Sequence, residues 1–337
     1  MVAPTRVVVG AGAWGTTLAT LLGAKGPVTL LARDEAQAAA IDSERENTRR
    51  LPGIALPETV TVSADPDVVA GASELVILAV PSRVMRGCAR SIAGLVHGDA
   101  VVVSVAKGIE AVSLQRMTEV IVDEIPAAAD RVAALSGPNL APEIARGLPA
   151  GSVVGTADDA VAGRVITVLG SRMFRLYSNT DVVGVELAGA LKNIIAIVAG
   201  AVDQLEAGDN GKAAITTRGL TEITRLGVAM GANPLTFAGL AGMGDILATC
   251  NSPLSRNHRL GMELASGRSW AEVEGSLPGV AEGAYTVKAA VALAGQHRVE
   301  MPIAREVDAV LYEGKSVAAA LMDLLSRDSK DELTGLG

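Results

Sequence analysis

The 337-residue chain has few of the side chains on which several classes of protein depend. Its two cysteines, Cys88 and Cys250, cannot build a disulfide framework, and its three histidines are scattered. Aromatic residues make up only 2% of the sequence, so the core must be built from aliphatic side chains. No basic tract offsets the net charge of -8, which argues against a nucleic-acid partner. We therefore expect no metal site, no nucleic-acid partner and a reducing, cytoplasmic location.

Long hydrophobic runs are also scarce. The N-terminus leads directly into a short apolar segment and lacks the layout of a signal peptide. One run, residues 182–202, is nearly long enough to cross a bilayer, but it contains Glu186, Lys192 and Asn193. We find no second run of this kind, so we expect a soluble protein without stable membrane insertion.

Short Val-rich segments alternate with helix-like stretches in the first half of the chain. Their continuous hydrophobicity is typical of parallel strands that are covered on both faces. The expected strands are 6–10, 28–31, 75–79, 100–104, 132–136, 152–155 and 174–177. This series predicts a doubly wound, Rossmann-like α/β domain over residues 1–178. Residues 179–337 have long helical patterns, which predict an all-α second domain with a loose tail from Asp328.

A glycine-rich loop, Gly10-Ala-Gly-Ala-Trp-Gly15, follows the first expected strand and precedes a helix expected from Thr16 to about Leu22. Gly10 permits a tight turn, Gly12 lets backbone N–H groups approach a pyrophosphate, and Gly15 allows close packing of helix on strand. The N-terminus of the helix adds a positive potential. Because strand, loop, helix and next strand follow in this order, we favour a dinucleotide site over a turn without a ligand.

The residues at the end of the second expected strand bear on the choice of cofactor. Arg33, which is 18 residues after Gly15, would favour the 2′-phosphate of NADP or stack on adenine. Asp34 would favour the ribose hydroxyl of NAD, but it is also suited to cap the next helix. A solvated surface position is a third option for Arg33. The sequence therefore predicts NAD or NADP without choosing between them.

Lys192 is the most unusual charge in the chain, because it lies within the apolar run 182–202. At 100° per residue it shares a helix face with Glu186, Asn193 and small residues, while bulky aliphatic residues occupy the opposite face. Small neighbours let another chain, a cofactor or a substrate come close. Burial lowers the pKa of a lysine toward the range in which it exchanges protons at neutral pH. We expect Lys192 in an active site; a purely structural pairing with Glu186 is the alternative.

Further polar groups stand in apolar or glycine-rich settings. Lys107 and Asn139 follow expected strands and so belong to the carboxyl edge of the sheet, where ligands bind in such folds. Asp245 lies beside two glycines, and Ser-Arg-Asn at 255–257 combines a hydroxyl, a guanidinium and an amide, which suits a small anion. Each of these is weak alone, and their joint occurrence supports a substrate site.

Seven motifs now stand in a specific order along essentially the whole chain. They are Gly10-Ala-Gly-Ala-Trp-Gly15, Ala106-Lys-Gly-Ile-Glu110, Ser136-Gly-Pro-Asn-Leu-Ala141, Leu191-Lys-Asn-Ile-Ile-Ala196, Thr217-Arg-Gly-Leu220, Gly242-Met-Gly-Asp245 and Ser255-Arg-Asn257. In this combination they resemble the bacterial-type NAD(P)-dependent sn-glycerol-3-phosphate dehydrogenases. The resemblance implies hydride transfer between NAD(P) and the pair glycerol 3-phosphate and dihydroxyacetone phosphate, which supplies glycerophospholipid synthesis.

The resemblance also implies roles for individual residues, with Lys192 as the proton donor and acceptor. The substrate-binding residues that it implies are Lys107, Gly137, Asn139, Lys192, Asp245, Ser255, Arg256 and Asn257. Cofactor contacts are implied for Ala13, Trp14, Arg33, Lys107, Ala141, Arg256, Val280 and Glu282, beside the loop glycines Gly10, Gly12 and Gly15. Asn139 stands where the family often has a hydroxyl residue, and Ala13 where serine is frequent.

Two rival classes share some of these features. β-Hydroxyacid and 6-phosphogluconate dehydrogenases have the same two-domain plan but resemble each other in a Lys and an Asn four residues apart on the helix. Here Lys192 and Asn193 are adjacent, and residue 196 is alanine. A non-catalytic dinucleotide sensor would need neither a buried lysine nor an anion-binding segment. The apolar composition is compatible with a homodimer, although no residue specifies its interface.

Overall fold

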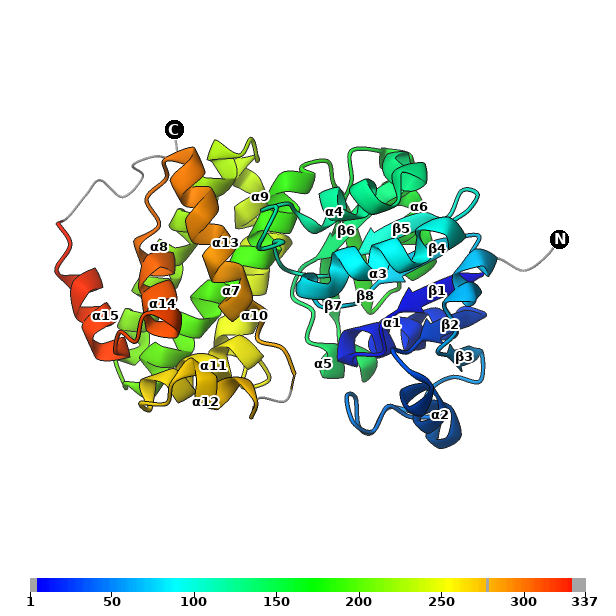
Figure 1. Cartoon of the computed structure of the whole chain (residues 1–337), viewed down its shortest axis with the longest axis horizontal. Helices are drawn as coiled ribbons and strands as arrows, with labels where there is room; N and C mark the ends of the chain where they lie inside the picture. Colours follow the sequence, from blue (N-terminus) through cyan, green and yellow to red (C-terminus); the bar gives the residue numbers. More distant parts are fainter. Residues whose placement is uncertain (1–4, 277–278, 329–337) are drawn as a thin grey trace. The chain divides into compact units, whose positions relative to one another are not determined.

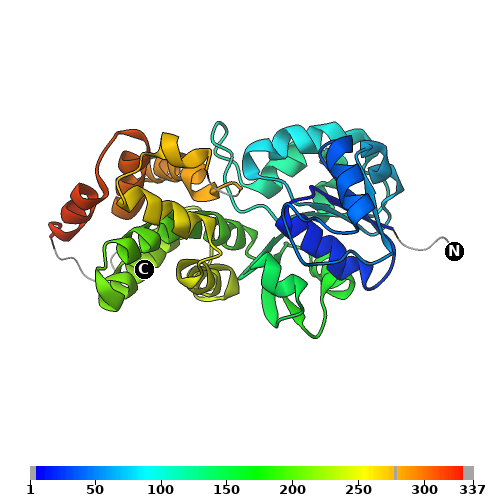
Figure 2. The same cartoon turned by 90° about the horizontal axis from the view of Figure 1, so that it is seen from below.

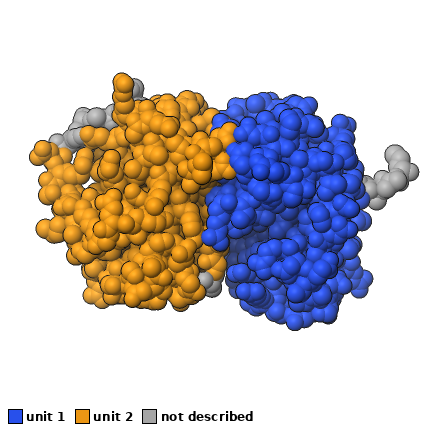
Figure 3. Space-filling model, in the orientation of Figure 1, with its two compact units in different colours: residues 1–106, 117–182 blue, residues 107–116, 183–337 orange. Residues whose placement is uncertain are grey.

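The computed structural model describes residues 5–276 and 279–328, in two compact units (Figure 1). Unit 1 consists of residues 1–106 and 117–182, and unit 2 of residues 107–116 and 183–337 (Figure 3). The chain therefore passes from one unit to the other at 106/107, 116/117 and 182/183. The short segment 107–116, which contains Lys107, belongs with the helical unit although it interrupts the sequence of the sheet unit.

Unit 1 is built on an eight-stranded sheet with the order β3-β2-β1-β4-β5-β6-β7-β8. Neighbouring strands are parallel except for β6 and β7, which are antiparallel. The first six strands follow the order of doubly wound dinucleotide-binding folds, so the predicted α/β class is confirmed. The strands are β1 (Arg6–Val9), β2 (Val28–Leu31), β3 (Val60–Ser63), β4 (Leu75–Leu78), β5 (Val101–Ser104), β6 (Val132–Ser136), β7 (Ala150–Gly155) and β8 (Phe174–Asn179).

Helices cover both faces of this sheet (Figure 2). On β1, Val8 packs into the core that contains α1, whereas Val7 and Val9 pack into the core on the other face, which contains α3 and α4. This alternation explains the continuous apolar runs of the inner strands, because both faces of β1, β4, β5 and β6 are buried. The helical elements are α1 (Ala13–Gly23), α2 (Glu35–Glu44), η1 (Pro66–Gly71), η2 (Ser82–Val84), α3 (Met85–Ile92), η3 (Ala93–Leu95), α4 (Met117–Glu124), η4 (Pro126–Arg131), α5 (Ala141–Ala145) and α6 (Asp159–Leu169).

Two details of unit 1 differ from the sequence prediction. Strand β3 was not predicted, because it lies at the sheet edge and only Val60 of its four residues is buried, so it has no continuous apolar run. Helix α1 begins at Ala13, three residues before the predicted start at Thr16, since Gly12 already serves as its N-cap. Ala13 and Trp14 of the glycine loop are therefore helical.

The described residues of unit 2 form helices and one isolated bridge between Ile109 and Arg116, so the predicted helical character is confirmed. Several helix starts have local causes; for example, the side chain of Asn233 caps α9. Of the tail predicted from Asp328, only Asp328 itself belongs to the described residues. The elements are α7 (Val182–Gln204), α8 (Gly208–Ala229), α9 (Pro234–Ala238), η5 (Leu240–Gly244), α10 (Asp245–Asn251), α11 (Arg256–Ala265), α12 (Trp270–Glu274), α13 (Glu282–His297), α14 (Pro302–Tyr312) and α15 (Val317–Leu325).

Helix α7 is the buried core helix of unit 2. Among the described residues it is the one helix long and apolar enough to cross a membrane, yet 89% of its most apolar window is buried inside the protein. Its bulky face and its small face are both covered, since every residue from 184 to 197 is buried. A Cβ atom on Gly200 would lie 1.8 Å from the carbonyl oxygen of His258 in α11. At this position the small face therefore admits the backbone of a neighbouring helix.

Candidate active site

The glycine loop between β1 and α1 has the geometry of a dinucleotide site. Gly10 has a φ of +110°, and a Cβ atom there would lie 2.6 Å from the carbonyl oxygen of Ala79. A Cβ atom on Gly15 would lie 1.9 Å from the carbonyl oxygen of Gly10, so both positions require glycine. A Cβ atom on Gly12, in contrast, would meet no heavy atom within 4 Å. The loop is thus closed on the side of the sheet and open beside Gly12.

The N-terminus of α1 fits a pyrophosphate. Gly12 offers no side chain to cap the helix, so the first N–H groups and the positive end of the helix dipole remain available to an anion. The loop itself is held by amides that the sequence did not single out: Gln37 and Asn47 both donate to the carbonyl oxygen of Ala11, each at 3.1 Å. Asn47 also donates to Thr16 Oγ1 at 2.8 Å. These contacts fix the loop before any cofactor binds.

Trp14 and Ala141, two expected cofactor contacts, lie inside unit 1. The ring of Trp14 packs edge-on against Phe174 of β8, with 6.0 Å between the ring centroids. Its indole Nε1 is buried and has no hydrogen-bond partner within the described chain. A buried donor of this kind is costly unless a ligand satisfies it, which favours a bound group nearby. Ala141 begins α5, and its carbonyl oxygen accepts a hydrogen bond from Thr17 Oγ1 at 3.2 Å.

Arg33 and Asp34 form an ion pair at the end of β2, with Nη2 2.9 Å from Oδ2. Asp34 is the N-cap of α2 and accepts a hydrogen bond from the backbone N–H of Gln37 at 2.8 Å. This backbone bond, followed by the hydrogen bond from Arg33, lowers the pKa of Asp34. The side chain of Arg33 is 80% exposed. Of the two roles considered for Asp34, the structure shows the N-cap of α2. The exposed guanidinium of Arg33 is accessible to a ligand.

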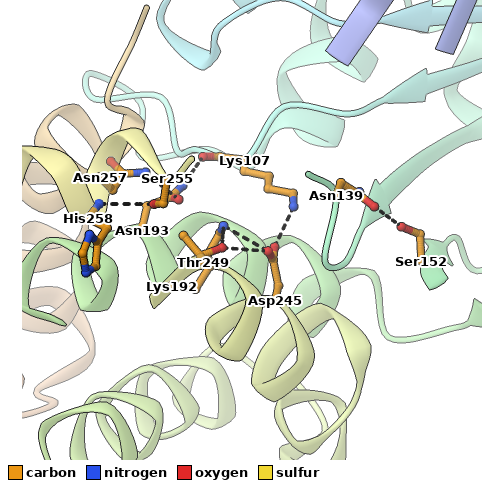
Figure 4. A network of polar contacts seen from close by, with 10 residues as sticks. All are labelled: Lys107, Asn139, Ser152, Lys192, Asn193, Asp245, Thr249, Ser255, Asn257 and His258. Carbon is orange, nitrogen blue, oxygen red and sulfur yellow. Dashed lines mark hydrogen bonds and ion pairs between the residues drawn. The ribbon is translucent and has the colours of Figure 1, made fainter. Parts of the chain in front are cut away.

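Gly137 and Asn139 follow β6 in unit 1. Ser152 of β7 donates a hydrogen bond to Oδ1 of Asn139 at 2.5 Å (Figure 4). The amide Nδ2 of Asn139 is buried without a partner in the described chain. Asn139, which stands where the family often has a hydroxyl residue, thus accepts a hydrogen bond from Ser152. Its Nδ2 donor is not used within the described chain.

Lys192, Asp245 and Lys107, three residues expected in a substrate site, lie together in unit 2 (Figure 4). Lys192 lies on α7 and is 6% exposed, and its Nζ is 3.0 Å from Oδ1 of Asp245, the first residue of α10. The other carboxylate oxygen of Asp245 lies 2.6 Å from Nζ of Lys107. The pairing of Lys192 with Glu186, considered from the sequence, is wrong, because Glu186 instead lies 2.7 Å from Nη1 of Arg116.

Thr249 completes this cluster and was not found from the sequence. Nζ of Lys192 donates to Thr249 Oγ1 at 2.5 Å, and Thr249 Oγ1 donates to Asp245 Oδ1 at 3.1 Å. The three side chains therefore form a closed triangle in which the amine has two fixed acceptors. The spacing of four residues between Asp245 and Thr249, on one face of a helix, was the available signal.

Burial and charge oppose one another in the cluster. Burial alone would raise the pKa of Asp245, but the charges of Lys107 and Lys192 outweigh it and hold the pKa below its usual value. Burial lowers the pKa of Lys107 to about 8; Asp245 opposes this shift and the charge of Lys192 adds to it. Two lysines thus share one carboxylate, so the cluster has fewer negative than basic groups and suits an anionic ligand.

The predicted anion-binding segment forms the N-terminus of α11. Ser255 is the N-cap, and its Oγ accepts from the N–H of His258 at 3.2 Å, which leaves the hydroxyl proton free to donate. Arg256 is exposed. Asn257 is buried; its Nδ2 donates to Oδ1 of Asn193 at 2.9 Å, and its Oδ1 accepts from the N–H of Gly283 at 2.9 Å. The Asn257 side chain is therefore occupied within unit 2, so its backbone N–H is the group that remains for a ligand.

The predicted site residues fall into two sets. Those in unit 1 are Gly10, Gly12, Ala13, Trp14, Gly15, Arg33, Gly137, Asn139 and Ala141. Those in unit 2 are Lys107, Lys192, Asp245, Ser255, Arg256, Asn257, Val280 and Glu282. Glu282 is the first residue of α13 and precedes Gly283, whose N–H donates to Asn257 Oδ1. Val280 lies two residues before Glu282. Each set is chemically coherent, with a dinucleotide loop in one and a lysine–carboxylate cluster in the other.

Together the doubly wound sheet, the glycine loop and the buried lysine cluster on an all-α unit define a two-domain dehydrogenase that depends on a nicotinamide dinucleotide. Comparison with known families gives the particular member of this class. The chain belongs to the NAD-dependent glycerol-3-phosphate dehydrogenase family, whose N-terminal model matches residues 6–162 and whose C-terminal model matches residues 181–322.

Individual relatives agree over nearly the whole chain. A protein of Streptomyces avermitilis named glycerol-3-phosphate dehydrogenase [NAD(P)+] is 45% identical over 334 residues, 98% of this chain and 99% of that protein. One of the same name from Moorella thermoacetica is 47% identical and covers 97% of each chain. The crystal structure of glycerol-3-phosphate dehydrogenase from Coxiella burnetii superimposes with a TM-score of 0.92 at 33% identity, over 96% of this chain and 99% of that one.

Proposed function

We propose that this chain interconverts sn-glycerol 3-phosphate and dihydroxyacetone phosphate with NAD or NADP, with Lys192 as the group that exchanges the proton at the C2 oxygen. Membership of the family over both halves of the chain supports the reaction. The observation that carries the role of Lys192 is its burial beside Asp245, at 3.0 Å. A proton-transfer group needs a fixed position as well as a suitable pKa, and this pair supplies the position.

When bound, a reduced nicotinamide would supply the hydride to C2. In the reductive direction Lys192 would donate the proton to the C2 oxygen. In oxidation Lys192 takes the same proton from the C2 hydroxyl. Asp245 and Thr249 hold the amine by its contacts at 3.0 and 2.5 Å, so that it approaches the oxygen in one orientation. The carboxylate also stabilises the ammonium form that each oxidation step produces.

Substrate phosphate is assigned to the positive groups of unit 2. Lys107 supplies an ammonium, the N-terminus of α11 supplies N–H groups and its dipole, and Arg256 with the Ser255 hydroxyl supplies further donors. Gly137 and Asn139 are proposed as additional substrate contacts from unit 1. On this basis residues 1–178 form the cofactor domain and residues 179–337 the substrate domain, with 107–116 serving the latter.

The cofactor is assigned to the open side of the glycine loop. The cleared space beside Gly12, the uncapped α1 and the unsatisfied Trp14 Nε1 support this assignment. Its remaining proposed contacts are Gly10, Ala13, Gly15, Arg33, Lys107, Ala141, Arg256, Val280 and Glu282.

We further propose a cytoplasmic enzyme that feeds glycerophospholipid synthesis and forms a homodimer. The support for the location is chemical, since Cys88 and Cys250 are both free thiols. Support for the dimer is the high apolar content, 49% of all residues. Light scattering of the purified protein would decide the oligomeric state.

A direct assay tests the reaction and the role of Lys192 together. Dihydroxyacetone phosphate is added with NADH or with NADPH, and the loss of absorbance is followed for the parent and for Lys192→Ala. We expect turnover in the parent and a loss of about 10³-fold or more in the variant, with cofactor affinity nearly unchanged. No oxidation of either cofactor by the parent would refute the reaction. Turnover that survives in Lys192→Ala would refute the proton role only.

A further inference from the structure

The segment 107–116 is a closed loop of unit 2. Ile109 and Arg116 form an antiparallel bridge at its base. Across the loop, the N–H of Glu110 donates to the carbonyl oxygen of Gln115 at 2.9 Å, and the N–H of Leu114 donates to that of Glu110 at 2.9 Å. Because the two ends of the loop are tied together, a displacement of Arg116 moves Ile109, which is two residues from Lys107.

Both ends of this loop are attached to the same face of α7. At one end, Asn193 Nδ2 donates to the carbonyl oxygen of Lys107 at 3.3 Å. At the other, Arg116 Nη1 lies 2.7 Å from Glu186 Oε2, and their side chains are only 13% and 6% exposed. Glu186 and Asn193 are seven residues apart, about two helical turns, so their side chains point in nearly the same direction. Lys192 lies between these two attachment points.

The charge on Glu186 has no part in the proton transfer described above, and it does not contact Lys192. The contact from Arg116 Nη1 to Glu186 Oε2 at 2.7 Å is a charge-assisted hydrogen bond between two buried groups, and such a bond is directional. It is also sensitive to small changes, because the loss of one buried charge leaves the opposite charge less well compensated. Such a pair is suited to hold the loop in one position.

We propose that Glu186, through Arg116, is a positioning residue that places the Lys107 ammonium against Asp245. The inference rests on the substrate role proposed above for Lys107. The loop carries the ammonium at one end and the ion pair at the other. When the pair is intact, Nζ of Lys107 stays 2.6 Å from the carboxylate that also holds Lys192. When the pair is lost, the loop loses an attachment to α7 at the end opposite Lys107, and the Lys107 ammonium is held less firmly in place.

A double-mutant cycle tests this proposal. We would measure kcat and KM for dihydroxyacetone phosphate in the parent, Glu186→Gln, Lys107→Ala and the double variant, together with the affinity for NADH. Glu186→Gln keeps the shape of the side chain and removes its charge. We expect it to raise KM for dihydroxyacetone phosphate about 10- to 100-fold while the affinity for NADH changes little. In the Lys107→Ala background the same substitution should change KM less than about twofold.

Glu124→Gln is the matched control, since Glu124 lies 2.8 Å from arginines Arg86 and Arg90 in unit 1 and is not part of the proposed site. It should leave both kinetic constants near those of the parent. If Glu186→Gln fails to fold, Arg116→Lys replaces it in the cycle, because lysine keeps the charge but not the planar guanidinium.

The outcomes separate the two layers of the proposal. Effects of Glu186→Gln and Lys107→Ala that multiply would overturn the positioning role, because they would mean that Glu186 acts independently of Lys107. A Lys107→Ala variant with the KM of the parent would overturn both the substrate role of Lys107 and the inference built on it. Non-additive effects on KM, with unchanged NADH affinity, support the inference.

Discussion

Lys107 Nζ lies 2.6 Å from Oδ2 of Asp245, although the two residues are 138 positions apart in the chain. The same carboxylate holds Lys192 with its other oxygen, at 3.0 Å. One buried aspartate therefore connects the residue proposed for substrate charge with the residue proposed for proton transfer. The protonation state of Lys107 should then be visible in the kinetics.

The affinity for dihydroxyacetone phosphate should depend on pH through Lys107. Because burial lowers the pKa of this lysine to about 8, it is charged below pH 8 and neutral above it. We expect KM to be nearly constant up to about pH 7, to be about doubled at pH 8, and then to rise by up to about tenfold per pH unit as the ammonium is lost. The substrate phosphate does not titrate in this range, since its second pKa is about 6.

Lys107→Arg is the control for this pH dependence. An arginine stays protonated throughout, because its pKa is about 12 or higher. KM of this variant should therefore remain flat from pH 7 to 10, even if its absolute value differs from that of the parent. A rise of KM above pH 8 that is identical in both proteins would assign the titration to another group.

Thr249→Val should lower kcat about 10- to 100-fold, with a small change in cofactor affinity. Valine has nearly the same shape as threonine but removes the hydroxyl that accepts from Lys192 and donates to Asp245. The amine then loses one of its two fixed acceptors. Thr249→Ser restores the hydroxyl and should recover most of the activity, as measured by NADH oxidation. Equal kcat in the valine and serine variants would rule out the hydroxyl contact as the cause.

Arg33→Ala should raise KM for NADPH about tenfold and change KM for NADH less than twofold, because a guanidinium is suited to a 2′-phosphate. The matched variant is Asp34→Asn, which retains an N-cap for α2 but removes the carboxylate 2.9 Å from Arg33. It should lower KM for NADPH. Parallel kinetics with the two cofactors measure both effects, and equal losses with NADH and NADPH in Arg33→Ala would exclude recognition of the phosphate.

The stability of the protein should depend on pH through Glu222 of α8. This carboxyl is buried and accepts from the N–H of Ile303 at 2.9 Å, at the N-terminus of α14. Burial raises its pKa to about 7, against 4.5 as the ordinary value, although the backbone donors and arginines act in the opposite direction. Between these two values the folded state binds the extra proton. The stabilisation is therefore complete below pH 4.5 and is lost as the pH rises through 7.

The glutamine in Glu222→Gln cannot ionise. The free energy of unfolding of this variant should therefore not decrease between pH 4.5 and 7 for this reason, whereas that of the parent should decrease by at most about 3 kcal/mol. Urea titrations between pH 5 and 8 would measure the difference from the parent. Glu263→Gln, on a partly exposed ion pair with Arg268, is the control and should keep the pH dependence of the parent. The same pH dependence in Glu222→Gln would exclude Glu222 as its source.

The sequence was sufficient where one residue stands out from its surroundings. The inner strands β1, β4, β5 and β6 could be predicted because both of their faces are buried. Strand β3 could not, because an edge strand with one buried residue has no such apolar run. Lys192 and Asp245 were found for the same reason, one in an apolar helix and the other beside glycines. The loop Gly10–Gly15 was found because its steric requirements are local.

The remaining groups could not be predicted, because their roles depend on contacts between distant segments. Thr249 is an ordinary helix residue until it meets Lys192, 57 positions away. Arg116 and Glu186 are separated by 70 positions, and a charged residue in a loop carries no sign of its partner. Gln37 and Asn47 likewise acquire meaning only when the chain brings them to the carbonyl oxygen of Ala11.

The placement of residues 107–116 in unit 2 has a consequence for how such enzymes can be recombined. A chimera that exchanged residues 1–178 as one module would import a foreign version of this loop, and with it a foreign Lys107 and Arg116. Asp245 and Glu186 would remain behind with the recipient. A compatible exchange must keep the loop with the helical unit. The module to be exchanged is then encoded by two separate segments of the gene, for residues 1–106 and 117–182. Residues 106 and 117 are the boundaries at which it has to be rejoined.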